Sequence, residues 1–237
     1  MVEKLLAEPT PAGASSSSLR FVDWMAQSQD PPDLLRKGDR RRLSLKLAAA
    51  QLLEDRGYDA FSTGDVSDKA QVTRTAFYVY FSSKQALTLD LLEDFQRFMM
   101  SVLRPARKGL SLAEAAYETN LAYIRFFAVN ARIILSVQNI RRSLSDAERL
   151  QFDMNDWWAH KVARTISNEH GKRSAVPSKR ALATAYALEA MIDGFLTELY
   201  VRNNPHLLAL KLDQTAVAHL LTDLWLRASG EQIARSD

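Results

Sequence analysis

The sequence predicts an all-α protein in which a compact three-helix head precedes a longer helical body. Apolar residues recur at intervals of three and four through most of the chain, which is the spacing of one helical face. Ser-x-x-Glu capping boxes at Ser111 and Ser145 begin two long segments. Glycine and proline interrupt the pattern often enough to separate individual helices.

Composition limits the classes of function. The 237 residues are 47% hydrophobic, which is enough for a buried core. Since cysteine is absent, disulfides, thiolate metal sites and cysteine nucleophiles are excluded, and a cytoplasmic location is expected. No stretch approaches the roughly 18 uncharged apolar residues of a membrane helix, so we expect no membrane association.

Residues 1–38 are expected to form a flexible leader, because they hold four of the seven prolines and a run of four serines. One segment of this leader, LRFVDWMA from Leu19 to Ala26, is too apolar to be favourable when fully exposed to solvent. We expect it to form a short helix or to dock onto the rest of the protein.

The head occupies residues 39–87 and begins with an amphipathic helix that ends at Gly57. A second helix of about two turns follows Ser62, whose spacing to Asp65 is close to a capping box. Thr73 is placed to cap a third short helix, and Ser82 or Ser83 then begins a long one. Two short helices joined by a turn of about three residues, with a longer helix before them, describe a helix-turn-helix.

The third helix carries side chains suited to double-stranded DNA. At two turns it is about 12 Å long, close to the width of the B-DNA major groove. Helical spacing lets Phe77 and Phe81 face the core of the head while Arg74, Thr75 and Tyr78 point away from it. Because arginine pairs with guanine or phosphate and tyrosine hydroxyls reach phosphate, the sequence predicts a DNA-binding head.

Other interpretations of the same residues stay open. Tyr78 and Tyr80 could simply cap the core of the head. Lys84 stands in the first turn of the next helix, where backbone N–H groups favour an anion, but alone it would be a solvated surface residue. Their joint occurrence favours DNA binding.

Residues 57–87, GYDAFSTGDVSDKAQVTRTAFYVYFSSKQAL, resemble the DNA-binding head of the tetracycline-repressor (TetR) family of bacterial transcription regulators. The positions in register are Gly57, Tyr58, Ser62, Val66, Ala70, Val72, Thr73, Phe77, Tyr78, Tyr80, Phe81, Lys84 and Leu87. The resemblance covers about 45 residues of the head and does not extend residue by residue into the body. It implies base contacts from Arg74 and Thr75. It implies phosphate contacts from Ser62 or Thr63, Thr73, Tyr78, Tyr80 and Lys84.

Two residues of the head depart from the family pattern, Gln71 and Gln85, and a basic run lies outside it. Gln85 replaces the usual acid, which still allows a reciprocal cap. Gln71 replaces the usual turn glycine, so either it takes a left-handed conformation at a cost of about 1 kcal/mol or the turn is built differently. The basic run that enters the first helix includes Arg41, which we count among the DNA-binding candidates. This run either follows the minor groove as a flexible arm or keeps the chain soluble.

The body, residues 88–237, is expected to be entirely helical. Helices are predicted near 84–103, 111–129, 131–141, 145–169, 179–202 and 208–228. The last two are apolar on more than one side and need two partners. The resemblance implies that the second partner is the same helix pair of another subunit, in a homodimer. The dimerisation candidates are Leu182, Phe195, Leu199, Leu220, Leu224 and Trp225.

Aromatic residues in the body exceed what tight helix packing needs, and the resemblance implies a small-molecule pocket there. The ligand-binding candidates are Tyr123, Phe126, Phe127, Met154, Trp157, Trp158, Tyr186 and Glu189. Ordinary core packing stays an alternative for each. One of the adjacent tryptophans is expected to face a cavity or a partner, and a bulky, largely hydrophobic effector is expected.

The sequence therefore predicts a bacterial DNA-binding transcriptional regulator, a repressor that binds a palindromic operator as a dimer and is released by its effector. The alternatives are a ligand-assisted activator and a small-molecule-binding protein whose head no longer contacts DNA. An enzyme is not expected, because phosphate-loop glycines, Glu-x-x-His, HExxH and GxSxG are absent. The four histidines lack metal-ligand spacing, so no cofactor or metal is expected.

Overall fold

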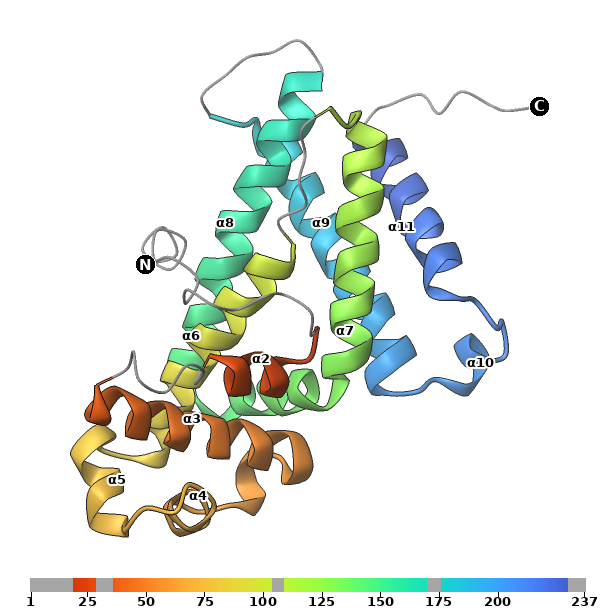
Figure 1. Ribbon diagram of the computed structural model, residues 1–237. Coiled ribbons are helices and arrows are strands. Elements are labelled where there is room, and N and C mark those ends of the chain that lie inside the picture. Colours follow the sequence, from red (N-terminus) through yellow and green to blue (C-terminus); the bar gives the residue numbers. More distant parts are fainter. Residues whose placement is uncertain (1–18, 29–35, 104–108, 170–175, 230–237) are drawn as a thin grey trace. The chain divides into compact units, whose positions relative to one another are not determined.

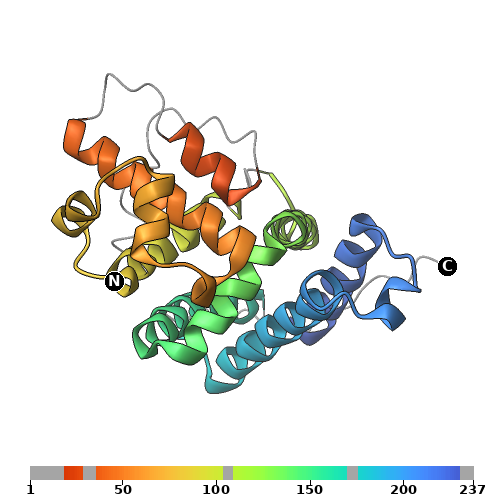
Figure 2. The same ribbon diagram turned by 90° about the horizontal axis from the view of Figure 1, so that it is seen from below.

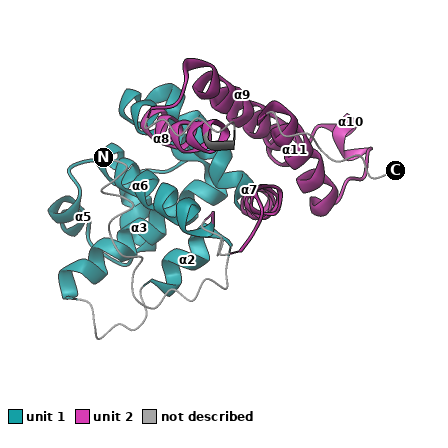
Figure 3. Ribbon diagram, turned by 90° about the horizontal axis from the view of Figure 1, so that it is seen from above, with its two compact units in different colours: residues 1, 3–102, 129–150 teal, residues 2, 103–128, 151–237 magenta. Residues whose placement is uncertain are grey.

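The computed structural model describes residues 19–28, 36–103, 109–169 and 176–229. All secondary structure within these residues is helical, which confirms the all-α prediction (Figure 1). Two compact units divide the chain, unit 1 from residues 3–102 and 129–150 and unit 2 from residues 103–128 and 151–237 (Figure 3).

The head contains the helices that the sequence predicts. They are α3 (Lys37–Arg56), α4 (Thr63–Lys69), α5 (Arg74–Tyr80) and α6 (Lys84–Val102), of which α3, α4 and α5 lie together in both views (Figures 1 and 2). Ser62 and Asp65 form a complete capping box at α4, and Thr73 accepts the N–H of Ala76 at 3.1 Å. Ser83, rather than Ser82, accepts the N–H of Ala86 in the first turn of α6.

The turn between α4 and α5 is a Schellman motif. The N–H of Gln71 donates to the carbonyl of Asp68 and that of Val72 to the carbonyl of Ser67, at 3.1 and 3.0 Å. Gln71 has a φ of 56°, which confirms the left-handed alternative. Gln71 therefore accepts the conformational cost that a glycine would avoid.

A buried ion cluster joins α3 to α6 in unit 1. Lys46 is 3% exposed, and its ammonium pairs with Asp90 at 2.7 Å and with Asp94. Each carboxylate has a second partner, Arg42 for Asp90 and Arg97 for Asp94. The cluster satisfies charges that would be costly to bury alone.

Part of the expected leader is an ordered element of unit 1. The segment from Phe21 to Gln27 forms helix α2, which confirms the expectation of a short helix within the leader. Its Phe21 ring lies 5.1 Å from the Phe95 ring, and its Trp24 ring lies 5.1 Å from the Phe98 ring. Both leader aromatics are buried, so α2 completes the apolar core of unit 1.

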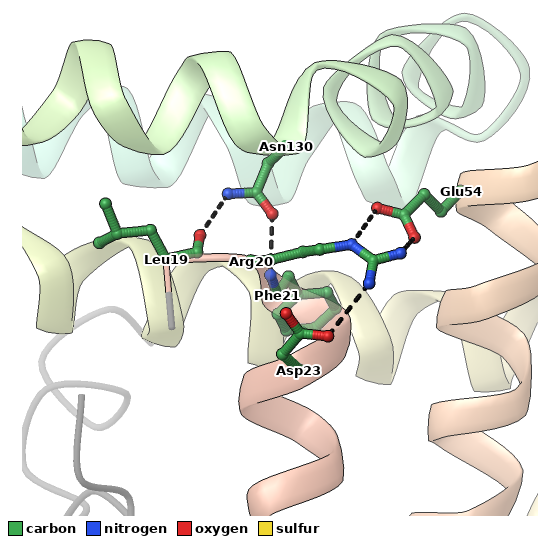
Figure 4. Close-up of polar contacts among 6 residues, drawn as sticks. All are labelled: Leu19, Arg20, Phe21, Asp23, Glu54 and Asn130. Atoms are coloured by element: carbon green, nitrogen blue, oxygen red, sulfur yellow. Dashed lines mark hydrogen bonds and ion pairs between the residues drawn. The ribbon is translucent and has the colours of Figure 1, made fainter. Parts of the chain in front are cut away.

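Polar contacts fix the start of α2 (Figure 4). The guanidinium of Arg20 holds both carboxylate oxygens of Glu54 on α3. The amide of Asn130 accepts the N–H of Phe21 at 2.8 Å and donates to the carbonyl of Leu19 at 2.7 Å (Figure 4). These bonds satisfy the N–H of the first helical residue and a carbonyl that precedes the helix.

The expected break near residue 130 is wrong, and the compact units do not follow the predicted boundary at residue 88, which stays a prediction. Unit 1 includes all of α6 and residues 129–150. Ser136 donates to the carbonyl of Leu53 at 2.9 Å, which ties this segment to the end of α3. One helix, α7 (Leu112–Ser143), replaces the two expected at 111–129 and 131–141, because Asn130 bonds to α2 and does not cap a new helix.

Unit 2 contains part of α7, most of α8 (Ser145–Glu169) and the C-terminal helices. The latter are α9 (Lys179–Leu196), a π turn (Thr197–Val201), α10 (Pro205–Leu208) and α11 (Gln214–Ser229). A single helix over 208–228 is therefore wrong: Lys211 has a φ of 53°, which ends the helical path between α10 and α11. The core of the unit brings Ala159 and Ala163 of α8 against Ala185 and Leu188 of α9.

One described helix, α7, is long and apolar enough to cross a membrane, with a mean hydropathy of 1.2 over its most apolar window. Half of that window is buried within the protein. Because the core helix of a soluble protein has the same properties, this is weak evidence for a membrane span.

Candidate functional site

Helix α5 has one buried and one exposed face, as its spacing predicts. Phe77 is fully buried and Phe81 is 4% exposed, whereas Tyr78 is 57% exposed. Arg74 and Thr75 are exposed as well. The basic and hydroxyl groups of α5 thus lie on the surface while its phenylalanines hold the helix in the head.

The hydroxyl groups around α5 differ in whether hydrogen bonds within the head already use them. Ser62 donates to the carboxylate of Asp65 at 2.6 Å, and hydrogen bonds from the Ser62 side chain and backbone lower the pKa of that carboxyl. The Thr63 and Tyr78 hydroxyls lie 3.4 Å apart on α4 and α5 and are exposed. Thr73 accepts from the backbone, which leaves its own proton for another acceptor. Of the alternatives Ser62 and Thr63, the geometry favours Thr63 as the phosphate contact.

Arg74 lies against α4 because Gly64 leaves room for it. A Cβ at Gly64 would come within 2.7 Å of an Arg74 guanidinium nitrogen. The sequence-based prediction missed this relation, and its only signal is a glycine inside a predicted helix. Gly64 therefore sets the position of the arginine that is predicted to contact bases.

Lys84 is engaged within the head. Its ammonium donates to the carbonyls of Tyr58 and Phe61, both at 2.7 Å, and lies 4.1 Å and 4.6 Å from the centres of their rings. Burial lowers the pKa of this ammonium, and nearby Asp59 opposes that effect. One of the three ammonium protons is left for a phosphate, so the predicted phosphate contact stays a prediction.

The basic run belongs to α3 from Lys37 onward, so its described part is a helix and not an extended arm. Arg41 is exposed on that helix. Tyr80 is half-buried, and a Cβ at Gly38 would lie 3.9 Å from its hydroxyl. The start of α3 therefore stands beside the end of α5, which places basic groups near the exposed face of that helix.

The dimerisation candidates divide into exposed and buried residues. Leu220 and Leu224 on α11 are 41% and 39% exposed. Leu199 is buried, and Phe195 is half-buried. Leu182 and Trp225 are partly buried against the core of unit 2. Further exposed apolar residues that the sequence-based prediction missed are Leu208, Leu210 and Leu212.

Most ligand-binding candidates already have partners within unit 2. Tyr123 donates to Asp193 at 2.7 Å, and burial followed by the charge of Asp193 raises its pKa well above the ordinary value. A hydrogen bond to Asp156, also 2.7 Å long, raises the pKa of Tyr186 to about 12. Burial and nearby Asp193 raise the pKa of Glu189 to about 8. The remaining candidates are packed as follows: Phe126, Phe127 and Met154 are buried, and Trp157 is half-buried.

A cavity of about 100 Å³ lies in unit 2, and Trp158 is the ligand-binding candidate that lines it. Its apolar wall includes Leu112, Val162, Ile192 and Trp225. Its polar lining comprises Thr119, Asn120, Lys161 and Thr165. In the part of the chain that the structure describes, no three His, Cys, Asp or Glu side chains gather as metal ligands would.

The chain is similar to known DNA-binding regulators. Residues 47–91 match the model of the family "Bacterial regulatory proteins, tetR family". The regulator EthR of Mycobacterium tuberculosis is 25% identical over 199 residues, which cover 80% of this chain and 87% of EthR. The activator FasR of Mycolicibacterium smegmatis is 37% identical over 68 residues, which cover 29% of this chain and 31% of FasR.

A solved structure shows the same fold. The crystal structure of a putative TetR-family transcriptional regulator from Syntrophomonas wolfei has a TM-score of 0.62 and 19% sequence identity. The likeness covers 84% of this chain and all of the other. The family match over residues 47–91 includes both α4 and α5 of the head.

Proposed function

From the premise that this chain belongs to the tetR family of transcriptional regulators, we propose that it is a cytoplasmic repressor that binds a palindromic operator as a homodimer. A small-molecule effector in unit 2 releases it. The observation that carries this proposal is the division of α5 into a buried phenylalanine face and an exposed face with Arg74, Thr75 and Tyr78.

In this proposal α5 enters the major groove. Arg74 and Thr75 contact base edges, and a forked contact from arginine to guanine gives sequence preference. Thr63, Thr73, Tyr78 and Tyr80 contact phosphates and fix the position of the helix. Lys84 donates two of its ammonium protons to carbonyls of the loop before α4, so it can make at most one hydrogen bond to a phosphate.

The exposed apolar groups of α10, of the loop after it and of α11 support a dimer. Leu220 and Leu224 lie one helical turn apart on α11, and Leu208, Leu210 and Leu212 precede them. A second subunit would cover these side chains in an isologous contact. The two heads of such a dimer would bind half-sites whose centres are about 34 Å, or a multiple of that distance, apart.

The effector acts by preferring one conformation of unit 2. Helices α7 and α8 each contribute residues to both units. A conformational change in unit 2 can therefore be transmitted to unit 1 through these helices. An effector shifts the equilibrium only by as much as its affinities for the two conformations differ.

Selection from a random duplex library, followed by fluorescence anisotropy at several salt concentrations, tests the proposal. We expect a palindromic consensus and an affinity that falls steeply with salt. Arg74→Ala should weaken binding about tenfold or more and relax the preference at one base. The exposed Arg164 of α8 offers the control, since Arg164→Ala lies outside the residues assigned to DNA or to the dimer contact and should leave binding unchanged. Failure to retain any duplex in dilute salt contradicts the proposal.

A ligand-assisted activator is the second candidate, because the name of FasR describes an activator. In vitro transcription from a promoter that overlaps the selected operator separates the two. A repressor lowers transcript yield and an activator raises it.

A further inference from the structure

Helix α5 carries a valine that the core of the head does not use. Val79 is 74% exposed, which is more than Tyr78 at 57% on the same helix. Valine is also less favourable than alanine within a helix, because its branched side chain loses rotational freedom against the preceding turn. Neither packing nor helix propensity therefore accounts for a valine at this position.

The helical repeat places Val79 at the outermost part of α5. Successive residues of an α-helix are rotated by about 100°, so Thr75 and Val79, four residues apart, lie one above the other on the same face. Both lie about 160° around the helix from Phe77, which is fully buried. Thr75 is exposed as well. The two residues therefore form a strip opposite the buried face, and this strip enters the major groove first if α5 binds there.

The strip is rich in methyl groups. Val79 has two methyl groups and no hydrogen-bonding group in its side chain, and Thr75 has one methyl group beside its hydroxyl. Among the four bases, only thymine displays a methyl group in the major groove, at C5. Apolar side chains recognise this group by direct contact, because both surfaces then leave water.

We propose that Val79, together with the methyl group of Thr75, contacts the C5-methyl of a thymine in each half-site of the operator. Val79 is then a specificity-determining residue in addition to Arg74. The proposal rests on the proposed function, since it takes the exposed face of α5 as the face that contacts DNA.

This contact differs in kind from the others assigned to α5. Arg74 is assigned hydrogen bonds to guanine, and Tyr78 is assigned a phosphate contact, which carries no sequence information. Loss of the Val79 side chain should therefore change the base preference at one position of each half-site and should not weaken binding to every duplex alike.

Repeated duplex selection with Val79→Ala identifies the thymine. We expect one thymine position in each half-site to lose its preference, while the guanine assigned to Arg74 is retained. Val79→Ala should fold as the wild type does, because alanine is the better helix former and Val79 lies outside the core; circular dichroism verifies this. An identical consensus for both proteins overturns the proposal, as does a wild-type consensus without such a thymine.

Replacement of that thymidine by deoxyuridine tests the methyl group directly, because deoxyuridine pairs with adenine in the same way and lacks only the C5-methyl. Fluorescence anisotropy compares the selected operator with the substituted one. We expect the affinity of the wild type to fall about fourfold for each thymidine replaced, which corresponds to about 0.8 kcal/mol for one buried group of this size. Val79→Ala should bind the two operators within about twofold of each other.

Tyr78→Phe is the matched control on the same helix. It removes a hydroxyl predicted to contact phosphate, so it should weaken binding to both operators alike and keep the fourfold preference for thymidine. Equal affinity of the wild type for both operators overturns the proposal, as does a thymidine preference that survives Val79→Ala. Failure of the wild type to bind any duplex counts against the repressor and this contact together, whereas duplex binding without the thymidine preference counts against the contact alone.

Discussion

Replacement of Lys46 by methionine tests the ion cluster that joins α3 to α6. The Lys46 side chain is 4% exposed and that of Asp94 is 7% exposed, so the change leaves two largely buried carboxylates without their shared cation. Removal of one partner from a buried pair costs about 3–5 kcal/mol. Arg97 lies 3.1 Å from Asp94 and Arg42 pairs with Asp90, so we expect the lower end, about 3 kcal/mol.

Urea denaturation followed by circular dichroism measures the effect. We expect the free energy of unfolding to fall by about 3 kcal/mol, and the melting temperature to fall by about 6–12 °C for a chain of this size. Lys179→Met, at an exposed position, should stay within about 0.5 kcal/mol of the wild type.

A double variant separates the lost pair from a general packing defect. Lys46→Met with Asp94→Leu removes one uncompensated carboxylate together with the cation, so it should be more stable than the single variant. A single variant as stable as the wild type, or a double variant less stable than the single one, would refute the reasoning.

Four further changes give separate expectations. Gln71→Gly should relieve the left-handed strain and raise the free energy of unfolding by up to about 1 kcal/mol in urea, and a loss of stability would contradict it. Gly64→Ala should raise helix stability by about 1 kcal/mol yet displace Arg74, so repeated duplex selection should return an altered consensus; an unchanged one would rule out a positioning role. Phe21→Ala should cost about 3–5 kcal/mol in urea, since its ring fills the core of unit 1, and a cost below 1 kcal/mol would show that α2 is not part of that core. Glu189 has its pKa raised to about 8, so the folded state keeps a proton that the unfolded state loses near pH 4.5, and stability falls as pH rises between these values. Glu189→Gln should therefore gain stability over the wild type as pH rises from 5 to 8 and hold that gain at pH 9, and a difference independent of pH would contradict this cause.

Local patterns predicted the head well, because its helices begin at residues whose side chains bond to nearby backbone. Ser62 and Thr73 cap α4 and α5 as expected, and these bonds span only three residues. The left-handed turn at Gln71 was one of two alternatives, since its conformation depends on carbonyls of the preceding helix. The apolar composition of LRFVDWMA indicated a docked helix, but not its partners.

Contacts between distant residues account for what the sequence left open. Asn130 bonds to backbone more than 100 residues away, so its role in holding α2 and continuing α7 has no local signal. Lys84 bonds to carbonyls of the loop before α4, which a basic residue at that position does not reveal. The lining of the cavity in unit 2 comes from α7, α8, α9 and α11 together, so no single stretch of the sequence could reveal it.

The central claim is that the exposed face of α5 occupies the major groove at two places on one duplex. Hydroxyl-radical footprinting with methylation interference at guanine N7, on the selected operator, tests it most directly. The account predicts two protected segments on the same face of the duplex, about one helical turn or a multiple of it apart, with interference that Arg74→Ala abolishes. A single protected segment, or guanine interference that persists without the Arg74 side chain, would contradict it.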